Sequence, residues 1–222
     1  MVEEREMEVW LTRHGQSQYN TESKIGGDSA LTQRGEKFAV LLGPWANSHV
    51  EMVWTSTLKR SIQTAEHVSL PTEQHKELDE LDVGTMDGLS YDEVQEKHPK
   101  EFLDRKDNKY LYRYPQGESY KDVVDRLKPL INQMLNLKQV GRLLIVCHQA
   151  VLRCLYGIIL QKKEEEIPFL DTHQHHVIGL TLKINNSDIT AATTKTTMTT
   201  TNNGLLKWEV VKEVLKKEEE LE

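Results

Sequence analysis

The sequence has few cysteines and no long apolar segment. Its 222 residues include only two cysteines, Cys147 and Cys154, which is too few for a disulfide framework or a cysteine-rich metal site. No apolar run approaches the roughly 18 residues that a membrane-spanning helix needs. The acidic start, MVEEREMEV, lacks the apolar segment of a secretory signal. We therefore expect a cytoplasmic protein with both thiols reduced.

An excess of positive charge is also missing, because the formal net charge is −7. No overall field then draws the chain to nucleic acid or to an anionic membrane, and we expect neither as a partner. Any anion that the protein binds must be held by a local cluster of Arg, Lys and His. We expect a small-molecule partner, and nothing in the sequence sets the oligomeric state.

Short apolar runs predict the fold class. Residues 9–11, 52–54 and 143–147 are apolar without alternation, which is typical of strands covered on both faces of a parallel sheet. Helical patterns lie between them, with Thr32 as a cap and with capping boxes at Ser90 with Glu93 and Ser119 with Asp122. The order of elements predicts a three-layer α/β/α domain whose mostly parallel sheet has helices on both faces.

The end of the chain has a different character. Residues 176–184 alternate as an edge strand would, and they close the predicted main domain, residues 1–186. Residues 187–204 are rich in threonine and low in complexity, so we expect an inserted loop or a linker. Residues 205–222 fit a strand that returns beside 176–184 or a short amphipathic helix, followed by a charged tail. The returning strand is favoured.

Two histidines follow apolar runs directly. His14 comes after residues 9–11 and His148 after residues 143–147, so both should lie at the carboxyl edge of the sheet, where ligands bind in such folds. Arg13 disfavours a protonated His14, and a neutral imidazole is a nucleophile. A cation in a cleft calls for an anionic substrate, and phosphate suits guanidinium groups best. Arg60, at the start of a helix whose amides favour an anion, would add a second such group.

A proton donor for the departing oxygen is expected in LDELDVG. Asp79, Glu80 and Asp82 lie within four residues there, and an extended segment puts Glu80 and Asp82 on one face. A glutamate crowded by other carboxylates keeps its proton more readily, which suits a general acid. Taken alone the stretch is a solvated acidic loop, but beside the histidine pair we interpret Glu80 as the acid.

These residues carry a family resemblance. LTRHGQSQYN and CHQAVLR resemble the histidine phosphatase superfamily, which has a phosphoglycerate mutase-like fold. GGDSALTQRG, WTSTLKRSIQTAE and LYRYPQGESYKDVVDRL narrow the resemblance to the fructose-2,6-bisphosphatase domain of a bifunctional kinase/phosphatase, over about residues 8–182. The resemblance implies hydrolysis of fructose 2,6-bisphosphate at the 2-position through a phosphohistidine, without cofactor or metal.

The resemblance also implies a role for each matching residue. His14 would become the phosphohistidine, Glu80 would act as acid and then base, and Arg13, Arg60 and His148 would grip the transferring phosphoryl group. Asn20 and Gln149 would add hydrogen bonds there. The residues implied to bind the sugar, its 6-phosphate or the pocket wall are Gly26, Tyr91, Arg105, Lys109, Tyr120 and Arg153.

Departures from the family pattern keep other functions open. Gln16 stands where the family commonly has Glu, DGLSYDEV is closer to the wider superfamily, and the kinase motif G-x-x-x-x-G-K-[ST] is absent. A phosphoglycerate mutase, a broad phosphatase or an inactive metabolite-binding protein are the alternatives. A zinc site at DTHQHHV, with His173 and His175 on one side of an extended segment, is a further alternative that lacks evident third and fourth ligands.

Overall fold

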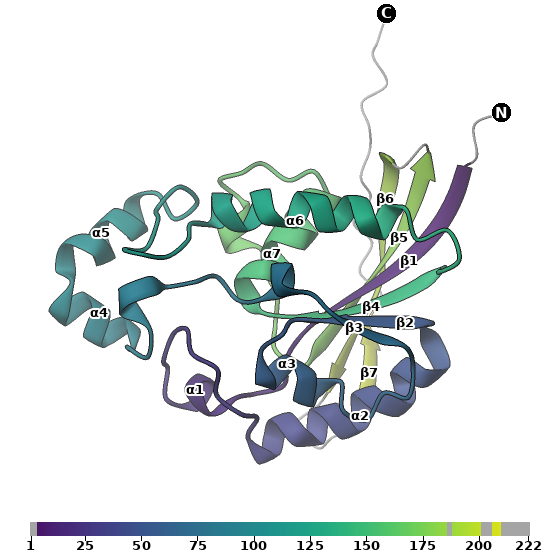
Figure 1. Cartoon of the computed structure of the whole chain (residues 1–222), viewed down its shortest axis with the longest axis horizontal. Helices are drawn as coiled ribbons and strands as arrows, with labels where there is room; N and C mark the ends of the chain where they lie inside the picture. The colour runs from purple at the N-terminus through teal and green to yellow at the C-terminus, as the bar shows by residue number, and fades with distance from the viewer. Residues whose placement is uncertain (1–3, 186–187, 201–205, 210–222) are drawn as a thin grey trace, which may run out of the picture.

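The computed structural model describes residues 4–185, 188–200 and 206–209. Within these ranges seven strands form one sheet in the order β3-β2-β4-β1-β5-β6-β7 (Figure 1). The first four strands of this order run parallel, and the last three are added antiparallel beyond β1. The bounds are β1 Glu4–Arg13, β2 Met52–Thr55, β3 Thr72–Gln74, β4 Arg142–Cys147, β5 His176–Asn185, β6 Asp188–Thr200 and β7 Leu206–Glu209.

Helices cover both faces of this sheet, which confirms the predicted α/β architecture (Figure 1). Helices α2 and α3 lie on one face, and α6 and α7 lie on the other, while α4 and α5 extend beyond the sheet. The helices are α1 Gln18–Thr21, α2 Gln33–His49, α3 Lys59–Thr64, α4 Tyr91–Lys97, α5 Pro99–Asp107, α6 Tyr120–Leu135 and α7 Gln149–Ile159, with 3₁₀ turns η1 Lys76–Leu78, η2 Gly84–Met86 and η3 Ile167–Phe169.

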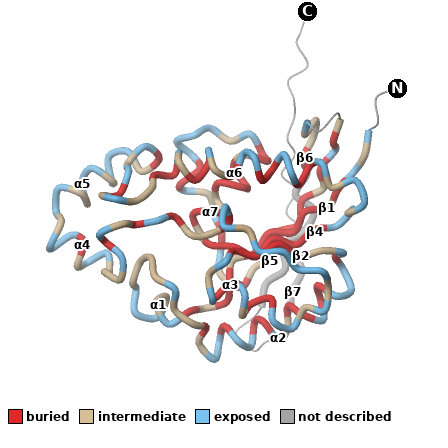
Figure 2. The backbone as a smooth tube through the Cα atoms, viewed as in Figure 1, coloured by how far each residue is buried: buried red, intermediate tan, exposed pale blue. Residues whose placement is uncertain are grey.

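The central strands bury side chains on both sides, as their unbroken apolar runs predict (Figure 2). In β1, Trp10 packs with α2, where its ring meets that of Trp45 edge-on at 5.2 Å between centroids. Its neighbours Val9 and Leu11 belong to the larger core under α6 and α7. The sheet therefore packs against a hydrophobic core on each of its two faces, and both cores support its carboxyl edge.

Caps predicted from the sequence fix where helices begin. Ser90 with Glu93 and Ser119 with Asp122 form complete capping boxes at the starts of α4 and α6, and Thr32 caps α2. These side chains satisfy backbone N–H groups that have no partner inside the helix. The three helix starts are confirmed.

The Thr-rich stretch differs from the expected loop or linker. Residues 188–200 form β6, which pairs antiparallel with β5 along most of its length. Threonine is β-branched and favours strands, and the pairing with β5 gives the strand its backbone hydrogen bonds. β7 returns as a strand, but its partner is β6 and not residues 176–184. The rest of the predicted tail, 205 and 210–222, lies outside the described residues.

None of the helices in the described ranges is both long and apolar enough to cross a bilayer.

Candidate active site

The carboxyl ends of β1 and β4 bring the two predicted histidines together. The strands are paired in parallel, with Arg13 opposite Cys147, and the His14 N–H donates to the Cys147 carbonyl at 2.9 Å. The next residues, His14 and His148, therefore leave the sheet side by side, and their ring centroids are 5.0 Å apart. Both rings are almost fully buried. The predicted meeting of the histidines occurs.

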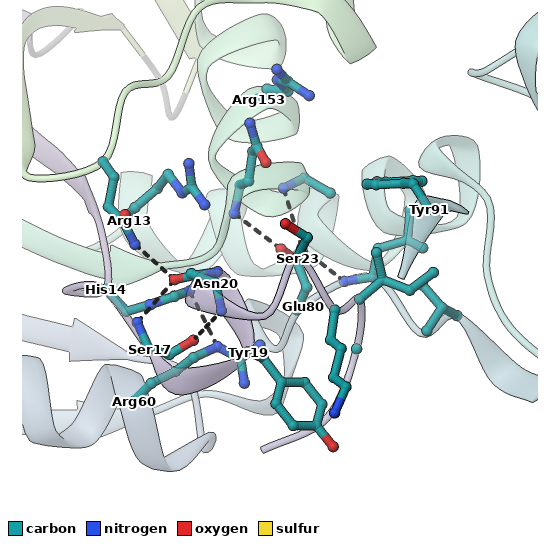
Figure 3. A pocket seen from close by; sticks show the side chains of 18 of the residues that line it. Arg13, His14, Ser17, Tyr19, Asn20, Ser23, Arg60, Glu80, Tyr91 and Arg153 are labelled. Carbon is teal, nitrogen blue, oxygen red and sulfur yellow. Dashed lines mark hydrogen bonds between the residues drawn. The ribbon is translucent and has the colours of Figure 1, made fainter. Parts of the chain in front are cut away.

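The tautomer of His14 follows from its contacts (Figure 3). Its Nδ1 lies 2.7 Å from the carbonyl oxygen of Gly15, and because a carbonyl only accepts, Nδ1 carries the proton. Nε2 then keeps its lone pair and accepts a hydrogen bond from Arg60 Nε at 3.1 Å. Burial, then Arg60 and then Arg13, hold the His14 pKa well below its usual value. The ring is a neutral imidazole, and burial contributes more to this than the adjacent Arg13.

His148 lies behind His14 and has one free nitrogen. Its Nε2 is 2.7 Å from Ser56 Oγ, and its Nδ1 is buried without a hydrogen-bond partner. Burial, followed by the charge of Arg60, lowers its pKa well below the usual value. Arg13 Nε is likewise buried without a partner. Arg13 lines the cavity beside His14, so its unpaired Nε is available to a ligand with acceptor oxygens.

Arg60 is fixed by two acceptors. Besides its bond to His14, its Nη1 donates to the Gly27 carbonyl at 2.7 Å, and the side chain is buried. The amide of Lys59 at the start of this helix already binds an anion of the protein itself, because the Asp28 carboxylate accepts from it at 2.7 Å. Arg60 faces the cavity through its guanidinium group.

Glu80 is held at the start of α7. Its Oε2 accepts from the Gln149 N–H at 3.1 Å, and its Oε1 accepts from the Ala150 N–H at 3.2 Å. The predicted crowding of carboxylates does not occur, because Asp79 binds Thr57 and Asp82 binds the Gly84 N–H. A helix N-terminus and its free amides position this carboxylate instead.

A second group of cations lies further along the same cavity. Lys109 Nζ donates to the Pro168 carbonyl at 3.0 Å, and Arg153 Nε donates to the Leu170 carbonyl at 2.9 Å. Arg105 stacks over the Tyr91 ring at 5.1 Å and donates to its hydroxyl at 3.3 Å. Burial, and then Arg105 and Arg153, lower the Lys109 pKa to about 8. Three cations thus lie in one part of the cavity, and no carboxylate of the described residues forms a salt bridge with them.

One cavity of about 400 Å³ connects both groups. Every candidate residue from the sequence lines it except His148, which lies behind His14. Gly26 has a φ of +74°, and a Cβ there would meet Asp87 Oδ1 at 2.2 Å, so only glycine fits this wall. The sequence did not single out Tyr114, although its block YRYPQGESY was noticed, or Gln174, whose segment was weighed as a metal site. Four other polar lining residues were not singled out either: Ser17, Tyr19, Ser23 and Lys24.

The zinc interpretation of DTHQHHV is wrong. His173 Nε2 pairs with Asp171 at 2.7 Å, while His175 Nε2 accepts from the Gln16 N–H at 3.0 Å. Across the part of the chain that the structure describes, no three His, Cys, Asp or Glu side chains are placed to hold a metal ion. The imidazole of His175 is instead stacked on Phe38 at 4.9 Å.

A comparison with models of protein families identifies the family of the chain. The family model of the histidine phosphatase superfamily (branch 1) matches residues 9–193. The chain belongs to the histidine phosphatase superfamily. Membership confirms the resemblance carried by RHG and the second histidine, and phosphatase chemistry is the general function that goes with it.

Relatives among the histidine phosphatases refine this position. Over 176 residues the chain is 47% identical to 6-phosphofructo-2-kinase/fructose-2,6-bisphosphatase 3 of Rattus norvegicus and 46% identical to 6-phosphofructo-2-kinase/fructose-2,6-bisphosphatase of Gallus gallus. Each match covers 78% of this chain but only 31% and 37% of those two proteins. The chain thus spans about a third of the length of the curated relatives that it matches.

Solved structures of histidine phosphatases share the fold at lower identity. A mycobacterial glucosyl-3-phosphoglycerate phosphatase superposes with a TM-score of 0.74 and 21% identity, covering 93% of this chain and 98% of that one. The alpha-ribazole phosphatase from Shigella flexneri gives a TM-score of 0.73 and 23% identity, covering 85% and 95%. These likenesses establish the fold and carry no information on the substrate.

Proposed function

We propose that the protein hydrolyses fructose 2,6-bisphosphate at the 2-position, giving fructose 6-phosphate and phosphate through a phosphohistidine at His14. The observation that carries this proposal is the pair of cation groups in one cavity, one beside the His14 nucleophile and one made by Arg105, Lys109 and Arg153. A substrate with two phosphates on one small sugar matches both groups. The names of the curated relatives support the same substrate.

In the first step, His14 Nε2 attacks phosphorus while the bond to the sugar oxygen breaks. Arg13 and Arg60 bind the phosphoryl oxygens and stabilise the charge that they carry in the transition state. Ser56 Oγ lies 2.7 Å from His148 Nε2, and we assign the hydroxyl as the donor, which leaves the proton of His148 on Nδ1 for a further phosphoryl oxygen. Glu80, protonated at this point, gives its proton to the leaving oxygen.

In the second step, the ionised Glu80 takes a proton from water, and the resulting hydroxide attacks phosphorus. The bond between phosphorus and Nε2 breaks, the electron pair returns to His14, and inorganic phosphate leaves. Asn20 and Gln149, which line the cavity, donate hydrogen bonds to the phosphoryl group in both steps. The Nδ1–H bond of His14 to Gly15 fixes the ring throughout.

The second cation group selects the substrate. Arg105, Lys109 and Arg153 bind the 6-phosphate, with Tyr91 and Tyr120 as hydroxyl partners of the two guanidinium groups. Gly26, whose φ of +74° favours glycine, lines the same cavity. A monophosphate lacks the group that these residues bind, so we expect it to be hydrolysed less efficiently.

A phosphate-release panel tests the substrate. Fructose 2,6-bisphosphate, 2,3-bisphosphoglycerate and simple phosphomonoesters are compared, and the first should have the highest kcat/KM. Arg105→Ala should raise KM for the sugar bisphosphate roughly 10- to 100-fold, because hydrogen bonds to charged groups contribute about 1.5–3 kcal/mol. The matched control is Arg113→Ala, from the same stretch, whose exposed side chain pairs with Asp122.

A labelling experiment, read together with the phosphate-release panel, separates the other candidate functions. Substrate labelled at the 2-phosphate should leave an acid-labile label on the wild type and none on His14→Ala. A label at His14 with the highest kcat/KM for 2,3-bisphosphoglycerate or for monoesters would favour a mutase or a broad phosphatase. Failure to trap any label during incubation with all substrates would favour an inactive binding protein.

A further inference from the structure

The segment before β5 contacts residues 14–21, which follow β1, include α1 and are called the nucleophile loop below. Gln174 Nε2 donates to Asn20 Oδ1 at 2.8 Å, and His175 Nε2 accepts from the Gln16 N–H at 3.0 Å. At the start of β5, the His176 carbonyl accepts from Thr12 Oγ1 of β1 at 2.7 Å. Of Gln174, His175 and His176, Gln174 alone lines the cavity. Its side chain therefore lies where it can influence the bound phosphate.

The Asn20 amide has its oxygen fully engaged (Figure 3). Oδ1 accepts from the Ser17 N–H at 3.0 Å in the capping box of α1, and it accepts from Gln174 at 2.8 Å. An amide oxygen has two lone pairs, so both are used. The Asn20 NH₂ group makes no hydrogen bond within the described part of the chain, and Asn20 lines the cavity beside His14. The two N–H donors are thus left for a ligand.

We infer that Gln174 is a positioning residue, which fixes the Asn20 amide so that its NH₂ group faces the transferring phosphoryl group. If the amide turned over, its oxygen would face the phosphate oxygens and repel them. The Ser17 N–H alone resists this turn with one neutral hydrogen bond, and Gln174 supplies the second. This inference rests on the proposed phosphohistidine chemistry at His14, but it does not depend on which sugar or ester carries the phosphate.

The effect of Gln174 is expected on the transition state more than on substrate binding. The three phosphoryl oxygens move into one plane as the bond to Nε2 forms and the bond to the leaving oxygen breaks, so a correctly oriented donor matters most there. Binding of the sugar and of its second phosphate involves other residues. Loss of the Gln174 donor should therefore lower kcat and leave KM nearly unchanged.

A double-mutant cycle tests this. Gln174→Met is close in shape to glutamine but cannot donate, and it should lower kcat about fivefold, the factor that one neutral hydrogen bond carries. Affinity for orthovanadate, which mimics the transferring phosphoryl group, should fall by a similar factor. In the Asn20→Ala background, Gln174→Met should change neither quantity by more than twofold, because the group that it orients is absent. Gln18→Met, an exposed position on the same loop, is the matched control and should behave as wild type.

Two outcomes would overturn the inference. The first is an unchanged kcat and vanadate affinity in Gln174→Met. The second is an equal loss in the presence and absence of the Asn20 amide, which would indicate a general structural role. Gln174→Glu gives an independent variant, which should lose more than Gln174→Met because a carboxylate attracts the Asn20 NH₂ group. The vanadate arm needs no sugar, so a wrong substrate assignment would leave its result intact.

Discussion

Lys109 is the residue whose protonation should appear in the pH dependence of the proposed reaction. Burial, with Arg105 and Arg153 nearby, lowers its pKa to about 8. Below that pH the side chain is a cation that binds a second phosphate, and above it the charge is lost. We expect KM for a sugar bisphosphate to rise between pH 7 and pH 9, while KM for a monoester stays flat.

The control for this pH effect lies three residues earlier in the chain, at Lys106. Lys109→Met should start from a higher KM and lose the rise above pH 8, whereas Lys106→Met, at an exposed position of α5, should keep the wild-type profile. A bisphosphate KM that rises equally in the wild type and in Lys109→Met would assign the titration to another group.

At the residue scale, the sequence predicted which residues lie at the site better than it predicted the contacts that position them. His14 and His148 could be paired because each follows a buried strand and such strands end at one edge. Their hydrogen-bond partners could not be predicted, because Arg60 reaches His14 from a different element. Glu80 was found for a reason that proved wrong, since the amides of α7 position it and not its carboxylate neighbours.

At the element scale, the nucleophile loop touches the first turn of α2 backbone to backbone. A Cβ on Gly35 would meet the Gln16 carbonyl oxygen at 2.2 Å. Gly→Ala inside a helix usually stabilises by about 1 kcal/mol, but here the helix and loop must separate. We expect Gly35→Ala to lower the free energy of unfolding by about 1–3 kcal/mol, measured by urea titration, and to reduce turnover at least tenfold.

Gly141→Ala is the control for Gly35→Ala, because its Cβ would have only an ordinary contact with Glu51 at 3.6 Å. This variant should unfold and turn over as the wild type does. Wild-type stability and turnover in Gly35→Ala would mean that α2 does not constrain the loop.

The positions of helices and strands were predicted correctly where local sequence patterns determine them. They were not predicted where pairing within the sheet determines them. Apolar runs and capping boxes located the central strands and the starts of α2, α4 and α6. The Thr-rich stretch has no apolar periodicity and ends in the turn residues Asn202, Asn203 and Gly204, so its low complexity suggested a loop although threonine favours strands. Pairing with β5 makes it β6, and that partner is a tertiary fact.

At the scale of the whole molecule, the cavity joins groups from widely separated segments, so a ligand there should stabilise the entire fold. Orthovanadate at 100 times its Kd should raise the free energy of unfolding by about 2.7 kcal/mol. For a chain of this length that corresponds to a rise in Tm of about 5–10 °C, measured by calorimetry. Arg60→Ala should lose most of this rise, and Arg113→Ala should keep it. An equal rise in both variants would place the vanadate elsewhere.

The sheet order also has a consequence for biosynthesis. Because β1 lies between β4 and β5, the nucleophile that follows β1 is synthesised before the partners that lie later in the chain. Arg153 finds its carbonyl acceptor, and Asn20 its second donor, only after the segment before β5 has left the ribosome. Until that segment emerges, a nascent chain holds its reactive imidazole without these contacts.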